Sequence, residues 1–107
     1  MTRRVKVYNK LVRDKIPGII SDSGKVPVTL MLPGHSYLTA LNNKLQEELE
    51  EYYEDFNIGE LADIQEVIDS ILEFHKVSKE QFKEIQDIKR AERGSFKNRI
   101  FLQSVEG

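Results

Sequence analysis

The feature that most constrains the fold is an apolar stripe with helical spacing that begins shortly after residue 36. Leucine and aromatic residues recur there at steps of three and four, at Leu38, Leu41, Leu45, Leu49, Tyr52 and Phe56. At 100° per residue, these side chains fall within a sector of about 80°. The stripe predicts an amphipathic helix with Ser36 as its N-cap, ending in the turn at residues 57–59.

A second apolar stripe follows this turn almost immediately, so a second helix is predicted from Gly59 or Glu60 onward. Its apolar side consists of Leu61, Ile64, Val67, Ile68, Ile71, Leu72 and His75. Because the connection between the two helices is only a few residues long, the helices are expected to pack antiparallel as a hairpin.

A third helix is predicted from Ser78 to about Arg93, where Gly94 is a natural end. Ser78 and Gln81 have the spacing of a capping box, which satisfies two backbone N–H groups at a helix start. Its inner side is formed by Phe82, Ile85 and either Ile88 or Lys89. Three such helices present more apolar surface than one chain of 107 residues covers, so a dimer that completes a four-helix core is expected.

The first 35 residues lack a helical pattern. Residues 4–12 alternate well enough for a short strand or an extended arm, and Pro17 and Gly18 then interrupt regular structure. Residues 26–32 are β-branched and apolar, which predicts a short strand, at a sheet edge because it contains Pro27. The predicted fold is therefore a mainly α, antiparallel helical bundle with a short extended or β segment at its N-terminus. The expected single domain divides into an N-terminal arm at 1–35, a helical core at 36–93 and a tail at 94–107.

Composition excludes several classes of protein. The chain has no cysteine, so neither a disulfide framework nor a thiolate metal site is available. It contains neither an uninterrupted apolar stretch near the length of a membrane span nor a signal-peptide pattern, so a cytoplasmic protein without a membrane partner is expected. Nucleic-acid binding is not expected either, because the basic residues are few and the longest predicted helices are acidic.

Charge is distributed very unevenly along the chain. Residues 47–73 hold eleven acids and no base, whereas residues 1–25 hold seven bases and two acids. Residues 76–99 again favour bases, with eight against four acids. A folded unit with this order can bring its own cations beside an acidic middle, which is how a polyanionic ligand is usually held.

Five of these acids border the faces that the first two helices turn toward each other. They are Glu47, Glu48 and Glu51 on the first helix, and Glu60 and Asp63 on the second. Acidic runs on helices are usually solvated faces, and acids in a first turn also complement the helix dipole. However, like charges on facing turns repel, and a set of four carboxylates suits a hard divalent cation such as Mg²⁺. Without a cation, the hairpin is expected to be less stable.

Two segments of the chain resemble a known family. The stretches "KLQEELEE" and "GELADIQEVID" are similar to the EExxE and ExxD motifs of the all-α nucleoside triphosphate pyrophosphohydrolases, the MazG-like superfamily. "YNKLVRDKIP" and "RAERGSF" resemble a small branch of house-cleaning pyrophosphatases related to phosphoribosyl-ATP pyrophosphohydrolase. The segments cover roughly half of the chain in the family's order. The gap between the two acidic motifs is shorter than in larger members, so the loop that often shapes the nucleotide pocket is nearly absent.

The resemblance implies hydrolysis of a nucleoside triphosphate between its α and β phosphates, giving a monophosphate and pyrophosphate. By the same resemblance, the Mg²⁺ ligands, with Mn²⁺ as a substitute, are Glu48, Glu51, Glu60 and Asp63. Glu47 is then a supporting group or the base that orients the attacking water. A homo-oligomer, dimer or tetramer, is expected.

The basic flanks supply candidates for phosphate contacts. These candidates are Lys10, Arg13 and Lys15 in the arm, and Lys89, Arg90 and Arg93 before Gly94. Each also has a structural explanation, because cations in the last turn of a helix favour its dipole and Arg13 can form a surface pair with Asp14.

Two other functions remain open on the sequence. One is a non-catalytic helical module that binds a nucleotide or a divalent ion. The other is an oligomerising bundle with a solvated acidic face, in which Mg²⁺ leaves the melting temperature unchanged.

Overall fold

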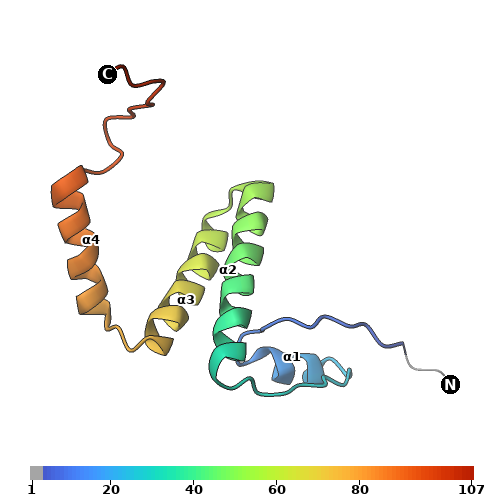
Figure 1. Cartoon of the computed structure of the whole chain (residues 1–107). Coiled ribbons are helices and arrows are strands. Elements are labelled where there is room, and N and C mark those ends of the chain that lie inside the picture. Colours follow the sequence, from blue (N-terminus) through green and yellow to red (C-terminus); the bar gives the residue numbers. More distant parts are fainter. Residues whose placement is uncertain (1–3) are drawn as a thin grey trace.

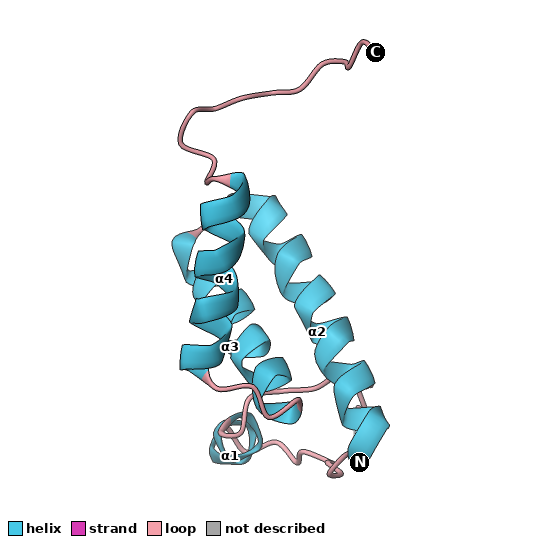
Figure 2. Ribbon diagram, turned by 60° about the vertical axis from the view of Figure 1, so that its left-hand side comes forward, coloured by secondary structure: helices cyan, strands magenta, loops and turns pink. Residues whose placement is uncertain are grey.

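The computed structural model describes residues 4–107 and contains helices and loops only over that range (Figures 1 and 2). The helices are α1 (Ile16–Asp22), α2 (Gly34–Asp55), α3 (Ile58–Phe74) and α4 (Lys79–Arg93). The prediction of a mainly α fold is confirmed. Within the described residues, none of the helices has the length and apolar character needed to cross a membrane.

Helices α2 and α3 form the predicted antiparallel hairpin and lie side by side (Figure 1). The reversal between them takes two residues. Phe56 adopts a left-handed conformation with φ of 54°, and its N–H donates to the carbonyl of Tyr52 at 2.7 Å. Asn57 was expected to end the first helix, but its side-chain oxygen accepts a 2.7 Å hydrogen bond from the N–H of Gly59 and so caps the start of α3.

The core of the hairpin is small. Leu41 on α2 is 2% exposed and Val67 on α3 is 7% exposed, and they are the buried apolar residues of the described chain. Other members of the two predicted stripes, including Leu49 and Leu61, remain partly open to solvent. The hairpin alone therefore buries only part of the apolar surface that the sequence provides.

The N-terminal arm differs from its predicted structure. Pro17 and Gly18 were expected to interrupt regular structure, yet they lie in α1. Proline is compatible with a first helical turn, because its missing N–H would have no partner there. The strand predicted at residues 26–32 is wrong, since this segment is irregular and largely exposed and pairs with no other strand in residues 4–107. Residues 4–12 likewise contain neither helix nor strand.

Of the helix boundaries predicted after residue 33, the start of α2 was wrong, whereas both ends of α4 are confirmed. The N-cap of α2 is Pro33, so the prediction of Ser36 was wrong by three residues. At α4, Ser78 Oγ accepts from the N–H of Gln81 at 3.1 Å, and Gln81 Oε1 accepts from the N–H of Ser78 at 2.8 Å. This capping box is confirmed, as is the end of the helix at Gly94, whose φ of 83° favours glycine.

Helix α4 and the tail extend away from the hairpin. α4 packs only against α3, and does so sparsely, whereas no contact joins it to α2 in the described chain (Figure 1). The radius of gyration is 19.2 Å, compared with about 13 Å for a compact domain of this length. Exposed apolar side chains continue along the tail, at Phe96, Ile100, Phe101, Leu102 and Val105. A single chain thus forms a two-helix core and leaves α4 largely uncovered.

The hairpin core can be tested by truncating its most buried side chain. Leu41→Ala is expected to reduce the free energy of unfolding by about 2–4 kcal/mol, because it removes apolar contacts and leaves a cavity. Urea denaturation followed by circular dichroism measures this loss. Leu30→Ala is the matched control, since Leu30 is exposed and its truncation should change stability by about 0.5 kcal/mol or less. Equal effects of the two substitutions would show that Leu41 is not the centre of the core.

Candidate metal centre

The hairpin brings the five predicted carboxylates together. Oxygens of Glu47, Glu48 and Glu51 lie within 4.8 Å of one another, and so do oxygens of Glu48, Glu60 and Asp63. Glu48 belongs to both groups and joins the two helices. We refer to these five residues as the carboxylate cluster. Glu51 lies three and four residues after Glu48 and Glu47, which brings it beside both on the surface of α2. The two-residue connection then sets the first turns of α3 opposite these three residues.

Glu48 is the most buried member of the cluster. The residue is 7% exposed, and its Oε1 lies 3.3 Å from Lys44 Nζ. Its second oxygen, Oε2, is buried and has no hydrogen-bond partner, and Glu60 Oε2 is in the same situation. Buried polar atoms in proteins are nearly always satisfied, and leaving one unsatisfied is unfavourable. Two such oxygens in one cluster are therefore the observation that separates this site from an ordinary acidic surface.

Burial and mutual repulsion raise the pKa values of these two carboxyls. Burial raises the pKa of Glu48, and Glu51 adds to the increase, while Lys44 opposes it. Burial also raises the pKa of Glu60, with repulsion from Asp55, Asp63 and Glu48 acting in the same direction. A raised pKa in the folded state means that ionised Glu48 opposes folding at neutral pH. This penalty is relieved as the pH falls through the raised pKa, and a bound cation would relieve it at neutral pH.

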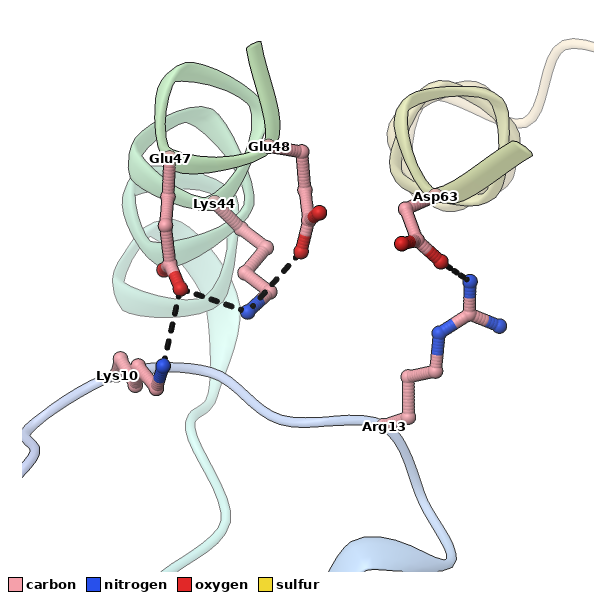
Figure 3. A network of polar contacts seen from close by, with 6 residues as sticks. All are labelled: Lys10, Arg13, Lys44, Glu47, Glu48 and Asp63. Carbon is pink, nitrogen blue, oxygen red and sulfur yellow. Dashed lines mark hydrogen bonds and ion pairs between the residues drawn. The ribbon is translucent and has the colours of Figure 1, made fainter. Parts of the chain in front are cut away.

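Three cations of the protein contact the cluster (Figure 3). Lys44 Nζ lies between Glu47 and Glu48, at 3.2 and 3.3 Å from their Oε1 atoms. Lys10 Nζ lies 3.0 Å from Glu47 Oε1, and Arg13 Nη2 lies 2.6 Å from Asp63 Oδ1. The repulsion expected from the sequence is therefore partly offset by the protein itself.

Glu47 differs from its neighbours in its pKa. Burial alone would raise the pKa of Glu47, but hydrogen bonds from Lys10 and Lys44 outweigh burial and hold it below its usual value. The pKa of Lys10 is raised in return, chiefly by its hydrogen bond to Glu47. Glu47 is thus held as an ionised hydrogen-bond acceptor at neutral pH.

The remaining candidates for phosphate contacts lie outside the cluster. Lys15 precedes α1 and is exposed. Lys89, Arg90 and Arg93 lie on α4, which does not contact α2. Arg90 and Arg93 occupy the last turn, where cations complement the helix dipole. Within one chain, the structure brings Lys10 and Arg13 to the cluster but not the basic residues of α4.

The sequence-based predictions did not include Lys44 as a partner of the carboxylates. Lys44 precedes Glu47 and Glu48 by three and four residues, the spacing at which a lysine and a glutamate meet on one helix face. This spacing was available in the sequence and would have identified Lys44 as a partner of the cluster.

Comparison with known proteins found no match in any of three searches, against family models, curated proteins and solved structures.

A cation should stabilise the folded protein through this cluster. With Mg²⁺ or Mn²⁺ at about a hundred times its dissociation constant, the melting temperature is expected to rise on the order of 10 °C, because an ion that bound only the folded hairpin would stabilise it by mass action. Differential scanning fluorimetry with and without EDTA measures the shift.

The matched variants for this experiment are Glu48→Gln and Glu54→Gln. Glu54 lies on the same helix and is exposed, and it belongs to neither oxygen group. Glu48→Gln should abolish the metal-dependent shift and Glu54→Gln should keep it. A shift that is the same in both variants, or absent from the wild type, would contradict a specific metal site.

Proposed function

We propose that the chain is a Mg²⁺-dependent nucleoside triphosphate pyrophosphohydrolase. It cleaves the bond between the α and β phosphates and gives a nucleoside monophosphate and pyrophosphate. The observation that carries the proposal is the pair of buried, unpartnered oxygens of Glu48 and Glu60 beside Asp63. Carboxylate oxygens converging on one small volume suit Mg²⁺, which completes its shell with waters and substrate phosphates.

Glu48, Glu51, Glu60 and Asp63 would hold the ion, with Mn²⁺ as a possible substitute. When bound, Mg²⁺ neutralises the triphosphate and lowers the pKa of a coordinated water. Glu47 would orient the attacking water and take its proton. The water oxygen adds to the α-phosphorus, the bond from that phosphorus to the bridging oxygen breaks, and pyrophosphate leaves with the electron pair. Such transfers depend mainly on positioning and charge stabilisation, which a helical hairpin with fixed carboxylates supplies.

The proposal includes a homodimer in the cytoplasm. Support for the dimer comes from the small core, the extended shape and the exposed apolar residues of α4 and the tail. A second copy could cover this surface and complete a four-helix core. Because α4 does not contact α2 and the described residues of α4 form ion pairs only within α4, Lys89, Arg90 and Arg93 would contact phosphates only in such an assembly. House-cleaning of noncanonical nucleotides is the role that the family resemblance suggests.

The second candidate is a non-catalytic module that binds a nucleotide or a divalent ion. The observation in its favour is the two-residue connection between α2 and α3, which leaves no loop there to form a pocket for the base. Such a module would bind Mg²⁺ in the same cluster but release no product.

A pyrophosphate-release screen over canonical and modified nucleoside triphosphates tests the proposal. Turnover is expected only with Mg²⁺ or Mn²⁺. Glu48→Gln and Asp63→Asn should lower it by more than the roughly 10–100-fold typical of groups that only support a metal ligand. Glu54→Gln should retain wild-type activity, because this side chain is exposed and lies outside the cluster.

The same screen separates the two candidates. If a nucleotide raised the melting temperature in the presence of metal but no product formed, the enzyme proposal would be overturned and the non-catalytic binding module would be supported. Turnover that persists in Glu48→Gln would show that the chemistry does not use the carboxylate cluster.

A further inference from the structure

The leading segment of the chain, residues 4–15, crosses one side of the hairpin and contacts both of its helices. Lys10 reaches Glu47 on α2 at 3.0 Å, and Arg13 reaches Asp63 on α3 at 2.6 Å (Figure 3). Asp63 is one of the residues to which the proposed function assigns the metal, and Glu47 belongs to the same carboxylate cluster. The leading segment and a metal ion therefore draw on the same negative charges.

The charges in the cluster show what this competition does. When ionised, its five carboxylates carry five negative charges, and Lys10, Arg13 and Lys44 contribute three positive charges at contact distance. The remainder of two negative charges matches one divalent ion. Withdrawal of Lys10 and Arg13 would leave four negative charges and attract a divalent ion more strongly.

The three cations differ in how easily they can leave. The Lys44 side chain is only 15% exposed and is fixed one turn from its partners on α2. Lys10 and Arg13 are more open, at 41% and 55%, and the segment that carries them has no helix or strand before α1. Exposed ion pairs of this kind contribute little to stability. The leading segment is thus the exchangeable part of the site.

We propose that Lys10 and Arg13 are intramolecular competitors of the metal that become ligands of the polyphosphate. In the metal-free protein they neutralise Glu47 and Asp63 and lower the affinity for a free divalent ion. When the ion binds with a polyphosphate, the ammonium and guanidinium groups transfer to the phosphate oxygens, for which their charge and donors are suited. This inference rests on the proposed function, because it requires a metal in the cluster and a polyphosphate beside it.

One consequence is a coupling between the two ligands. A polyphosphate that draws Lys10 and Arg13 away from the carboxylates strengthens metal binding, and by linkage the metal strengthens polyphosphate binding equally. The site would remain weakly occupied by free Mg²⁺ and would fill when the ion arrives with its substrate.

The test uses the full chain with both residues neutralised, Lys10→Gln with Arg13→Gln. Isothermal titration with Mn²⁺ alone should show binding about three- to tenfold tighter than in the wild type, since two competing pairs are removed. Titration with the preformed Mn²⁺–tripolyphosphate complex should show binding weaker by about tenfold, because two charged donors are lost. Tighter binding of Mn²⁺ together with weaker binding of the Mn²⁺–tripolyphosphate complex would indicate that Lys10 and Arg13 leave the carboxylates for the phosphate oxygens.

Two controls accompany this variant. Lys25→Gln makes a charge change of the same kind at an exposed residue outside the ion pairs of the cluster, and both affinities should stay at the wild-type values. Arg13→Lys keeps the charge and should keep the wild-type affinity for Mn²⁺. Arg13→Lys also tests the proposal if the double variant does not fold. Its affinity for the Mn²⁺–tripolyphosphate complex should still fall, because the planar guanidinium group with its paired N–H donors is lost.

The outcomes are distinguishable. Mn²⁺ binding that weakens or stays unchanged in the double variant would overturn the competition and show that the leading segment only braces the hairpin. A tripolyphosphate complex that binds Arg13→Lys and the double variant as tightly as the wild type would overturn the transfer to phosphate. If neither the wild type nor any variant binds Mn²⁺, the metal site of the proposed function itself fails.

Discussion

The interaction on which the rest of the structure depends is the packing of α2 against α3 around Leu41 and Val67. Burial of these side chains draws together two helices whose facing turns carry five carboxylates. Apolar burial is favourable and has no direction, so it can hold in place charges that would otherwise separate. The carboxylate cluster is thus a consequence of the packing of the two helices, which also leaves Glu48 only 7% exposed.

The sequence predicted those parts of the structure that depend on neighbouring residues. The stripe of apolar residues identified α2 and α3, and the capping box at Ser78 fixed the start of α4, because both signals act within one or two helical turns. The strand at 26–32 was wrong because β-branched residues form a strand only when another strand pairs with them. The separation of α4 from α2 was not predictable, because it depends on contacts between segments far apart in the sequence.

The candidate site divides in the same way. Helical spacing placed Glu47, Glu48 and Glu51 on one flank, and a short connection was enough to set Glu60 and Asp63 opposite them. The partners of these acids were harder to foresee. A surface pair with the adjacent Asp14 was the alternative considered for Arg13, but Arg13 pairs with Asp63, fifty positions away. Nothing in the local pattern distinguishes these two acids, since the choice is made by the path of an irregular segment.

The excess of negative charge between residues 44 and 63 is therefore partly neutralised by two kinds of counterion within the same chain. Lys44 is a permanent counterion, shielded from solvent and fixed on the helix that it neutralises. Lys10 and Arg13 are exposed counterions on a segment without regular structure. Together they offset part of the repulsion within the cluster, yet Oε2 of Glu48 and of Glu60 remain unsatisfied. Buried oxygens left unpaired carry a local free-energy penalty, and a cation bound beside them would remove it.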